Sequence, residues 1–174
     1  MRMIVRCLQA GIPAWLLIAA TSLPLGAQFE TPRVQERIGR EANPPPPHAP
    51  ESAQALWDAY VDLGTAFDPG IADLYADSAT IRNTRRYPDG RTQSLRMSGA
   101  EYKVLIRRAM PVARARGDVD VYSNVRLEEA GDRVRITATR YSTLKKYRVP
   151  HQLIVGNTGV GGWKILEETG ESMP

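Results

Sequence analysis

Residues 119–169 contain four consecutive segments in which apolar and polar side chains alternate, and short turns separate them. A period of two is typical of strands that bury one face and expose the other. Connections this short place successive strands antiparallel. The stretch therefore predicts a four-stranded antiparallel meander, and the rest of the chain must pack against its apolar face.

The alternation also predicts which side chains share the buried face. Folding each turn symmetrically places Arg140 opposite His151, and His151 opposite Glu167. Three ionisable groups then form one cross-strand row on the inner face, although a slip of one residue in a turn would move a strand's set to the other face. The predicted inner positions are Val119, Val121, Val125 and Leu127, then Val134, Ile136, Ala138, Arg140 and Ser142, then Val149, His151, Leu153 and Val155, and finally Trp163, Ile165 and Glu167.

The residues before the meander predict three helices and a hairpin. Apolar side chains recur at helical spacing over 53–65, and Asp68-Pro69 is typical of the start of a short second helix. Strands over 79–87 and 91–97 flank a Pro-Asp-Gly turn. Ser98 and Glu101 form a capping box for a helix that extends to about Arg114. This order predicts an α+β domain in which a curved antiparallel sheet packs against about three helices.

The N-terminal segment has the features of an export signal. Arg2 and Arg6 precede an apolar run, and Leu25-Gly26-Ala27 provides small residues for cleavage, so we expect a signal peptide over 1–27 and a periplasmic or secreted protein. A retained membrane anchor is the alternative. The single cysteine, Cys7, lies inside the predicted signal, so the mature chain would contain no thiol.

Between the signal and the domain, residues 28–50 include the run Pro44-Pro-Pro-Pro47, which favours an extended linker without a core. The folded domain is predicted over 51–171, followed by a short tail over 172–174. A domain of this length is of ordinary size.

The phrase Ala66-Phe67-Asp68, followed by Ile71-Ala-Asp-Leu-Tyr-Ala-Asp-Ser-Ala-Thr-Ile81, joins the second helix to the first strand. Together with the element order, it resembles the nuclear transport factor 2-like superfamily, which includes the SnoaL-like polyketide cyclases, ketosteroid isomerase and scytalone dehydratase. The resemblance covers about 51–171 and implies a sheet curled into a cone, partly closed by the helices. It also implies a scaffold that serves isomerases, dehydratases, cyclases, binding modules and dimerisation domains, so function has to be argued from the site.

Arg140, His151 and Glu167 form the best candidate site. A glutamate beside a histidine would raise the pKa of the imidazole and orient it as a general base, and Arg140 could bind a ligand carboxylate. Ser123 and Tyr141 are further candidate binding residues. The competing interpretation is a structural row of ion pairs that fixes the register of the sheet.

Other classes of site find little support. His48 and His151 are the only histidines, and with no cysteine after residue 7 no metal-binding spacing exists, so neither a metal nor a cofactor is expected. The glycine-rich segment 156–162 joins two strands and lacks the lysine of a phosphate-binding loop. Arginines at positions 82, 85, 86, 91 and 96 could form an anion-binding patch, but they fit better as the solvated face of a hairpin. Nucleic acid is not an expected partner.

These observations favour an exported ligand-binding or assembly module that forms a homodimer through its sheet and takes a small hydrophobic or anionic ligand. No stable membrane span would remain after signal cleavage. The alternative is a cofactor-free lyase or isomerase, similar to ketosteroid isomerase or the SnoaL-like cyclases, that uses His151 as general base. A deep, enclosed cavity around His151 and the glutamate would favour the enzyme, and a filled cone would favour the module.

Overall fold

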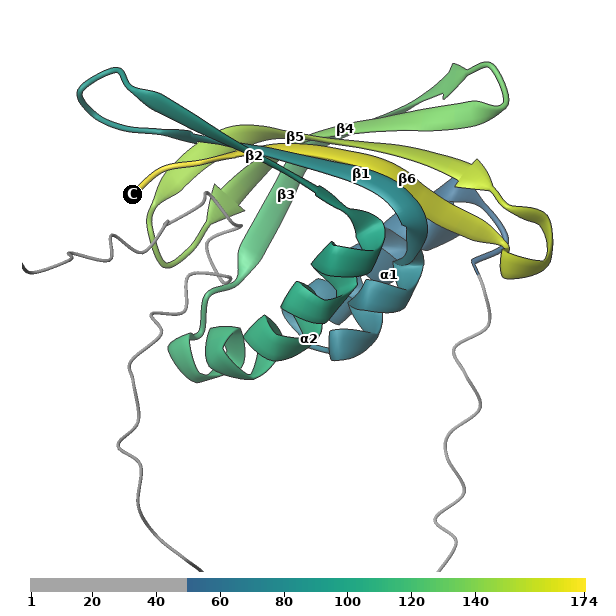
Figure 1. Ribbon diagram of the computed structural model, residues 1–174, viewed down its shortest axis with the longest axis horizontal. Coiled ribbons are helices and arrows are strands. Elements are labelled where there is room, and N and C mark those ends of the chain that lie inside the picture. The colour runs from purple at the N-terminus through teal and green to yellow at the C-terminus, as the bar shows by residue number, and fades with distance from the viewer. Residues whose placement is uncertain (1–49) are drawn as a thin grey trace, which may run out of the picture. The chain divides into compact units, whose positions relative to one another are not determined.

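The computed structural model describes residues 50–174 of the chain (Figure 1). The predicted signal peptide and nearly all of the predicted linker lie outside the described residues. None of the helices within this part of the chain is long and apolar enough to cross a membrane.

The helices begin and end where the sequence provides capping groups. The side chain of Ser52 accepts the backbone N–H of Ala55, and Ser98 forms the predicted capping box with Glu101. Gly117 ends the longest helix in the left-handed conformation at φ 63°, which a glycine adopts without strain. The helical segments are α1 (Ala53–Thr65), the 3-10 helix η2 (Pro69–Leu74), α2 (Gly99–Arg116) and the 3-10 turn η3 (Gly159–Gly161).

Six strands form one sheet in the order β2-β1-β6-β5-β4-β3. All neighbours pair antiparallel except β1 and β6, which pair parallel, so the sheet is mixed where the sequence predicted an antiparallel one. The hairpin and the meander each have short connections, whereas the contact between them joins segments far apart in the chain, and α2 lies between the two. The strands are β1 (Tyr75–Arg86), β2 (Thr92–Ser98), β3 (Asp120–Ala130), β4 (Arg133–Ser142), β5 (Tyr147–Asn157) and β6 (Trp163–Ser172).

Both long helices cover the same face of this curved sheet (Figure 1). The side chains between the two layers are almost all apolar toward the η3 end of β6, where Leu56, Ile106 and Ile165 are fully buried. Farther along the same face the buried groups become polar. The α+β architecture with a curved sheet against three helical segments is thus confirmed, and the polar half of its inner face positions the candidate site.

Two β-bulges alter the alternation that the sequence predicts. In β6, Val155 pairs with Ile165 but Ile154 pairs with Glu167, so Leu166 is an extra residue and the side chains after it change faces. In β3 the pairing shifts between Ser123 and Arg126, where Asn124 has a φ of 55°. Before this second bulge, Asp120 and Tyr122 face inward, whereas Val121 is 50% exposed. The predicted inner face of this segment is therefore wrong before the bulge.

Candidate functional site

One buried cavity on the inner face of the sheet is surrounded by ionisable and aromatic side chains. Arg140 from β4, His151 from β5 and Glu168 from β6 meet there with Tyr60 from α1 and Tyr122 from β3. The cavity has a volume of about 10 Å³, which is room for a single water molecule. Its remaining lining residues are Asn83, Asp120 and Gly170.

The structure thus brings Arg140 and His151 together as predicted, but the glutamate beside them is Glu168. Glu167 faces outward, where it pairs with Arg82 at 3.3 Å and approaches Arg133 at 3.9 Å. The bulge at Leu166 causes the exchange, because it rotates the end of β6 by one position. The predicted pairs also differ, since His151 lies opposite Ala138 and Gly170, and Arg140 lies opposite Val149.

Arg140 is held on three sides. It is 3% exposed and forms an ion pair of 3.0 Å with Asp120, whose side chain is 8% exposed. Its other terminal nitrogen donates to the carbonyl of Glu171 at 2.7 Å, and its guanidinium lies near the ring of Tyr147. The Asp120 carboxylate raises the pKa of Arg140 against the opposing effect of burial, so the guanidinium stays charged. With both terminal nitrogens engaged, Arg140 has little capacity left for the predicted binding of an anionic ligand.

His151 is stacked against Tyr60, with 5.8 Å between the ring centroids, and its Nε2 lies 3.3 Å from the Tyr60 hydroxyl. Burial, together with the nearby positive charge of Arg140, lowers the pKa of His151 from 6.5 to about 3. The sequence predicted a shift in the opposite direction. That prediction is wrong because burial disfavours the charged imidazolium and because the neighbouring charge is the positive guanidinium of Arg140. At neutral pH the imidazole is therefore uncharged and only weakly basic.

Glu168 is buried beside two tyrosines from different elements. The hydroxyl of Tyr75, at the start of β1, donates a hydrogen bond to Glu168 Oε2, and Tyr102 of α2 packs edge-on against Tyr75. Burial raises the pKa of Glu168 from 4.5 to about 7, against the lowering effects of the Tyr75 hydrogen bond and of Arg140. A carboxyl group that titrates near neutrality can give up or take a proton, which is a property found in binding and catalytic sites.

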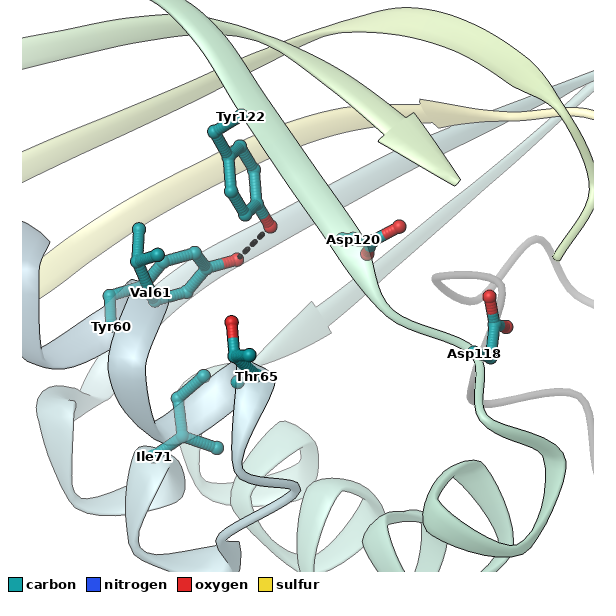
Figure 2. Close-up of a pocket in the computed structure, with 8 residues that line it drawn as sticks. Tyr60, Val61, Thr65, Ile71, Asp118, Asp120 and Tyr122 are labelled. Atoms are coloured by element: carbon teal, nitrogen blue, oxygen red, sulfur yellow. Dashed lines mark hydrogen bonds between the residues drawn. The ribbon is translucent and has the colours of Figure 1, made fainter. Parts of the chain in front are cut away.

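A second cavity of about 20 Å³ adjoins the first, between the end of α1 and the start of β3 (Figure 2). Tyr60, Asp120 and Tyr122 line both cavities and so mark their boundary. Figure 2 shows the hydroxyl of Tyr122 directed at that of Tyr60, and the two oxygens are 3.4 Å apart. This distance is long for a hydrogen bond between hydroxyls. We refer to this second space as the mouth pocket; its further lining residues are Val61, Gly64, Thr65, Ile71 and Asp118.

The remaining predicted site residues lie elsewhere. Ser123 is exposed on β3 at the bulge, where it pairs with Thr139, and it does not line either cavity. Tyr141 faces outward from β4, and the guanidinium of Arg148 lies 4.6 Å from its ring centroid. Neither residue lies with Arg140 and His151 at the cavity. Conversely, Tyr60 lies in the helix predicted over 53–65 and Tyr122 is not among the predicted inner positions, so neither was predicted to line a cavity.

Over residues 50–174, no group of three or more histidine, cysteine, aspartate or glutamate side chains is arranged to hold a metal ion. A groove of about 230 Å³ lies on the opposite face of the sheet. Its outward-facing lining residues are Thr137, Pro150, Gln152, Thr169 and Glu171, and it is also lined by Ala138, His151 and Gly170, whose side of the strand faces the cone.

Comparisons with known proteins agree with this architecture. No protein-family model and no curated protein matches the sequence. Among solved structures, a nuclear transport factor 2-like protein of unknown function from Pseudomonas putida is similar with a TM-score of 0.53 and 16% identity, over 68% of this chain and 82% of that chain. A Thiobacillus denitrificans protein proposed to be a calcium/calmodulin-dependent protein kinase type II association domain is similar with a TM-score of 0.50 and 12% identity, over 71% of this chain and 96% of that chain. The helices, the mixed sheet and these likenesses together show that the domain has the nuclear transport factor 2-like fold.

Proposed function

We propose that this domain is a binding module that takes a small ligand within the cone formed by the sheet and α1. The observation that carries the proposal is the convergence of Arg140, His151 and Glu168 from three adjacent strands inside a buried space. Burying ionisable groups is costly, and well-packed apolar side chains at such positions are often at least as stable. Polar groups that persist in a core at that cost are expected where the site has a function.

The cone is nearly filled in the conformation described, and a filled cone favours a module over an enzyme. Ligand pockets typically have volumes of roughly 300–1,000 Å³, whereas the two cavities here measure about 10 and 20 Å³. A ligand larger than water must therefore separate Tyr60 from Tyr122. Their long hydroxyl contact is weak, and a rotation of Tyr122 would join the cavities, but it would also separate the Tyr122 ring from those of Trp57 and His151.

The proposed cellular location of this module is inferred from the sequence. The proposed signal peptide over 1–27 would export the protein to the periplasm or beyond, and the proline-rich segment over 28–50 would act as a spacer. The outer face of the sheet, with its groove of about 230 Å³, is the surface that we propose for a homodimer. Light scattering on the mature chain tests the dimer independently of the ligand.

Native mass spectrometry on the mature chain, purified from its own cell envelope, tests the binding function. The expected result is an added mass of one small molecule per chain. Tyr122→Trp, which adds bulk at the boundary of the two cavities, should abolish the adduct. Tyr141→Trp, on the outer face, should leave it in place and serves as the matched control. Retention of the adduct by a folded Tyr122→Trp variant would exclude the cone as the site.

A second candidate function is a cofactor-free isomerase or lyase, and one observation favours it. Glu168 has a pKa of about 7 and is paired with a tyrosine hydroxyl, so it could accept a proton from carbon and return it. His151, the base suggested by the sequence, is less suitable because its pKa is about 3. Solvent deuterium incorporation into a panel of cyclic ketones tests this activity. Incorporation that is lost in Glu168→Gln and kept in Glu167→Gln would support the enzyme, and no incorporation with any ketone would argue against it.

A further inference from the structure

Arg85 on β1 is a buried guanidinium without a carboxylate partner. It is 6% exposed, and its Nε and Nη1 atoms are buried without a hydrogen-bond acceptor. None of the ion pairs within residues 50–174 includes it. The ring of Tyr87 lies 5.4 Å from its guanidinium carbon, but a ring contact gives the N–H groups no acceptor in their plane. The expectation that this arginine lies on the solvated face of the hairpin is therefore wrong.

The register of the sheet places Arg85 beside the first cavity. It follows Ile81 and Asn83 on the buried face of β1 and lies opposite Ser172 of β6. Asn83 lines the cavity and accepts a hydrogen bond from the Ser172 hydroxyl at 3.1 Å. Arg85 thus lies one inward-facing position beyond the cavity, toward the C-terminal ends of β1 and β6.

Two further donors lie at the same end of β6. Lys145, in the turn between β4 and β5, donates from Nζ to the carbonyl of Met173 at 3.3 Å. Burial and the charge of Arg85 lower the pKa of Lys145, and Asp118 opposes them with a smaller effect. Tyr147 starts β5, which runs antiparallel to β6, and its buried hydroxyl has no hydrogen-bond partner.

The buried acids of this region are engaged with other groups. Asp120 pairs with Arg140 at 3.0 Å, and Asp118 accepts a hydrogen bond from Ser142 at 3.3 Å. Each keeps one oxygen without a partner, but neither forms an ion pair with Arg85. Arg85 is therefore a positive charge that the protein buries and does not neutralise.

A buried charge without a partner is costly, and a second positive group nearby adds to that cost. A bound anion would lower it. A carboxylate fits the available groups, because one negative charge balances one unpaired guanidinium and its two oxygens can be satisfied by the Arg85 N–H groups and the Tyr147 hydroxyl. A phosphate dianion carries more charge and more oxygens than these donors would satisfy in a buried setting.

We propose that Arg85 binds the carboxylate of a small organic ligand, with Tyr147 as a second donor and Lys145 as a nearby positive charge. The inference rests on the proposed binding function and gives the ligand a chemical class. It also moves the predicted carboxylate-binding role from Arg140, whose terminal nitrogens are engaged, to Arg85. The remaining atoms of the ligand extend past Asn83 toward His151.

NMR titration of the Arg85 Nε–H signal tests the proposal, and loss of that signal in Arg85→Met assigns it. The probes are n-butyrate, n-butanol, n-butylammonium and inorganic phosphate, each added to the full chain at pH 7.5 and constant ionic strength. We expect a saturable shift with n-butyrate only. Amide shifts then measure the affinity of each variant for n-butyrate.

Arg85→Met should weaken n-butyrate binding by about tenfold or more, and Tyr147→Phe by about threefold, as expected for a charged and a neutral hydrogen bond. Arg96→Gln, which changes an exposed arginine on the neighbouring strand β2, should leave the affinity unchanged. Without ligand, Arg85→Met should melt at the same temperature as wild type or higher, because it removes a buried charge that has no partner.

Three outcomes would overturn the proposal. Equal shifts with n-butanol and n-butyrate, or a stronger response to phosphate, would show that a carboxylate is not selected. A large loss of stability in Arg85→Met would show that Arg85 has a structural partner, and Tyr147→Phe with unchanged affinity would remove the second donor. An adduct in native mass spectrometry that a folded Arg85→Met variant retains would reject this site and keep the binding function, whereas no adduct and no n-butyrate shift would reject both.

Discussion

Arg140 and Asp120 form an ion pair of 3.0 Å with both side chains almost completely removed from solvent. The pair joins β4 to the start of β3 at the boundary of the two cavities. Neither charge can be removed without leaving the other in a poorly hydrated space, and this makes the pair a sensitive test of how the inner face is built.

Removing one member of the pair should therefore strongly destabilise the folded domain. We expect Asp120→Ala to destabilise the domain by about 3–5 kcal/mol, because Arg140 remains buried and charged. Asp62→Ala, which removes an exposed carboxylate from α1, should leave stability nearly unchanged. Urea unfolding followed by circular dichroism measures both. A loss in Asp120→Ala no larger than that in Asp62→Ala would show that the pair is solvated.

Glu168 should make the domain less stable as the pH rises. The folded carboxyl has a pKa of about 7 and the unfolded one about 4.5, so between these values the folded chain keeps a proton that the unfolded chain has lost. Each pH unit in this window then removes about 1.4 kcal/mol, or roughly 3 kcal/mol in all. Glu168→Gln should abolish this component, and Glu167→Gln should retain it. Stability curves that are parallel for wild type and Glu168→Gln from pH 4.5 to 7 would contradict the assignment.

His151 should contribute the opposite slope. Its pKa is about 3 when folded and 6.5 when unfolded, so between these values only the unfolded imidazole is protonated. Stability from this residue is complete above pH 6.5 and is lost as the pH falls toward 3. In wild type the two slopes largely cancel between pH 4.5 and 6.5. His151→Gln should uncover the Glu168 slope, and Glu168→Gln should uncover that of His151. Thermal unfolding of both variants across this range measures the difference.

Gly99 allows α2 to start against β1. A Cβ at this position would lie 2.0 Å from the backbone oxygen of Ala76 and 2.9 Å from the Cβ of Ala79, so the helix would have to move. We expect Gly99→Ala to cost about 1–3 kcal/mol or more. At Gly64, where the nearest side chain is 3.7 Å away, alanine should stabilise α1 by about 0.5–1 kcal/mol. Opposite signs in the two variants are expected, and a neutral Gly99→Ala would exclude the close approach.

The alternation of apolar and polar residues predicted the buried face of a strand wherever the strand has no bulge. The positions predicted to face inward in β4 and β5, including Ile136, Arg140, His151 and Leu153, are buried, except that Val134 is only partly buried. Capping predicted the start of α2 for a similar reason, since Ser98 and Glu101 act on groups within a few residues. Local rules of this kind depend only on neighbouring residues.

The bulges could not be predicted from alternation, and they change the site. Leu166 and Asn124 each add a residue whose effect depends on the neighbouring strand, so Glu168 replaces Glu167 and Tyr122 replaces Val121 on the inner face. Asparagine tolerates a positive φ, and this was the one local signal of the β3 bulge. The parallel pairing of β1 with β6 likewise depends on contacts between distant segments. A prediction of the residue types in the site could therefore succeed while the exact glutamate was missed.

The claim that ligands bind inside the cone is tested most directly by the imidazole signals of His151 in a nitrogen-edited NMR spectrum. The chain has two histidines, and His48 lies in the predicted linker, so the signals can be assigned with one His48→Gln variant. On addition of a ligand identified by native mass spectrometry, the His151 ring signals should shift in proportion to occupancy. A ligand that leaves them unchanged while shifting the amides of Thr137, Gln152 and Thr169 would bind in the groove on the outer face, and that result would contradict the account.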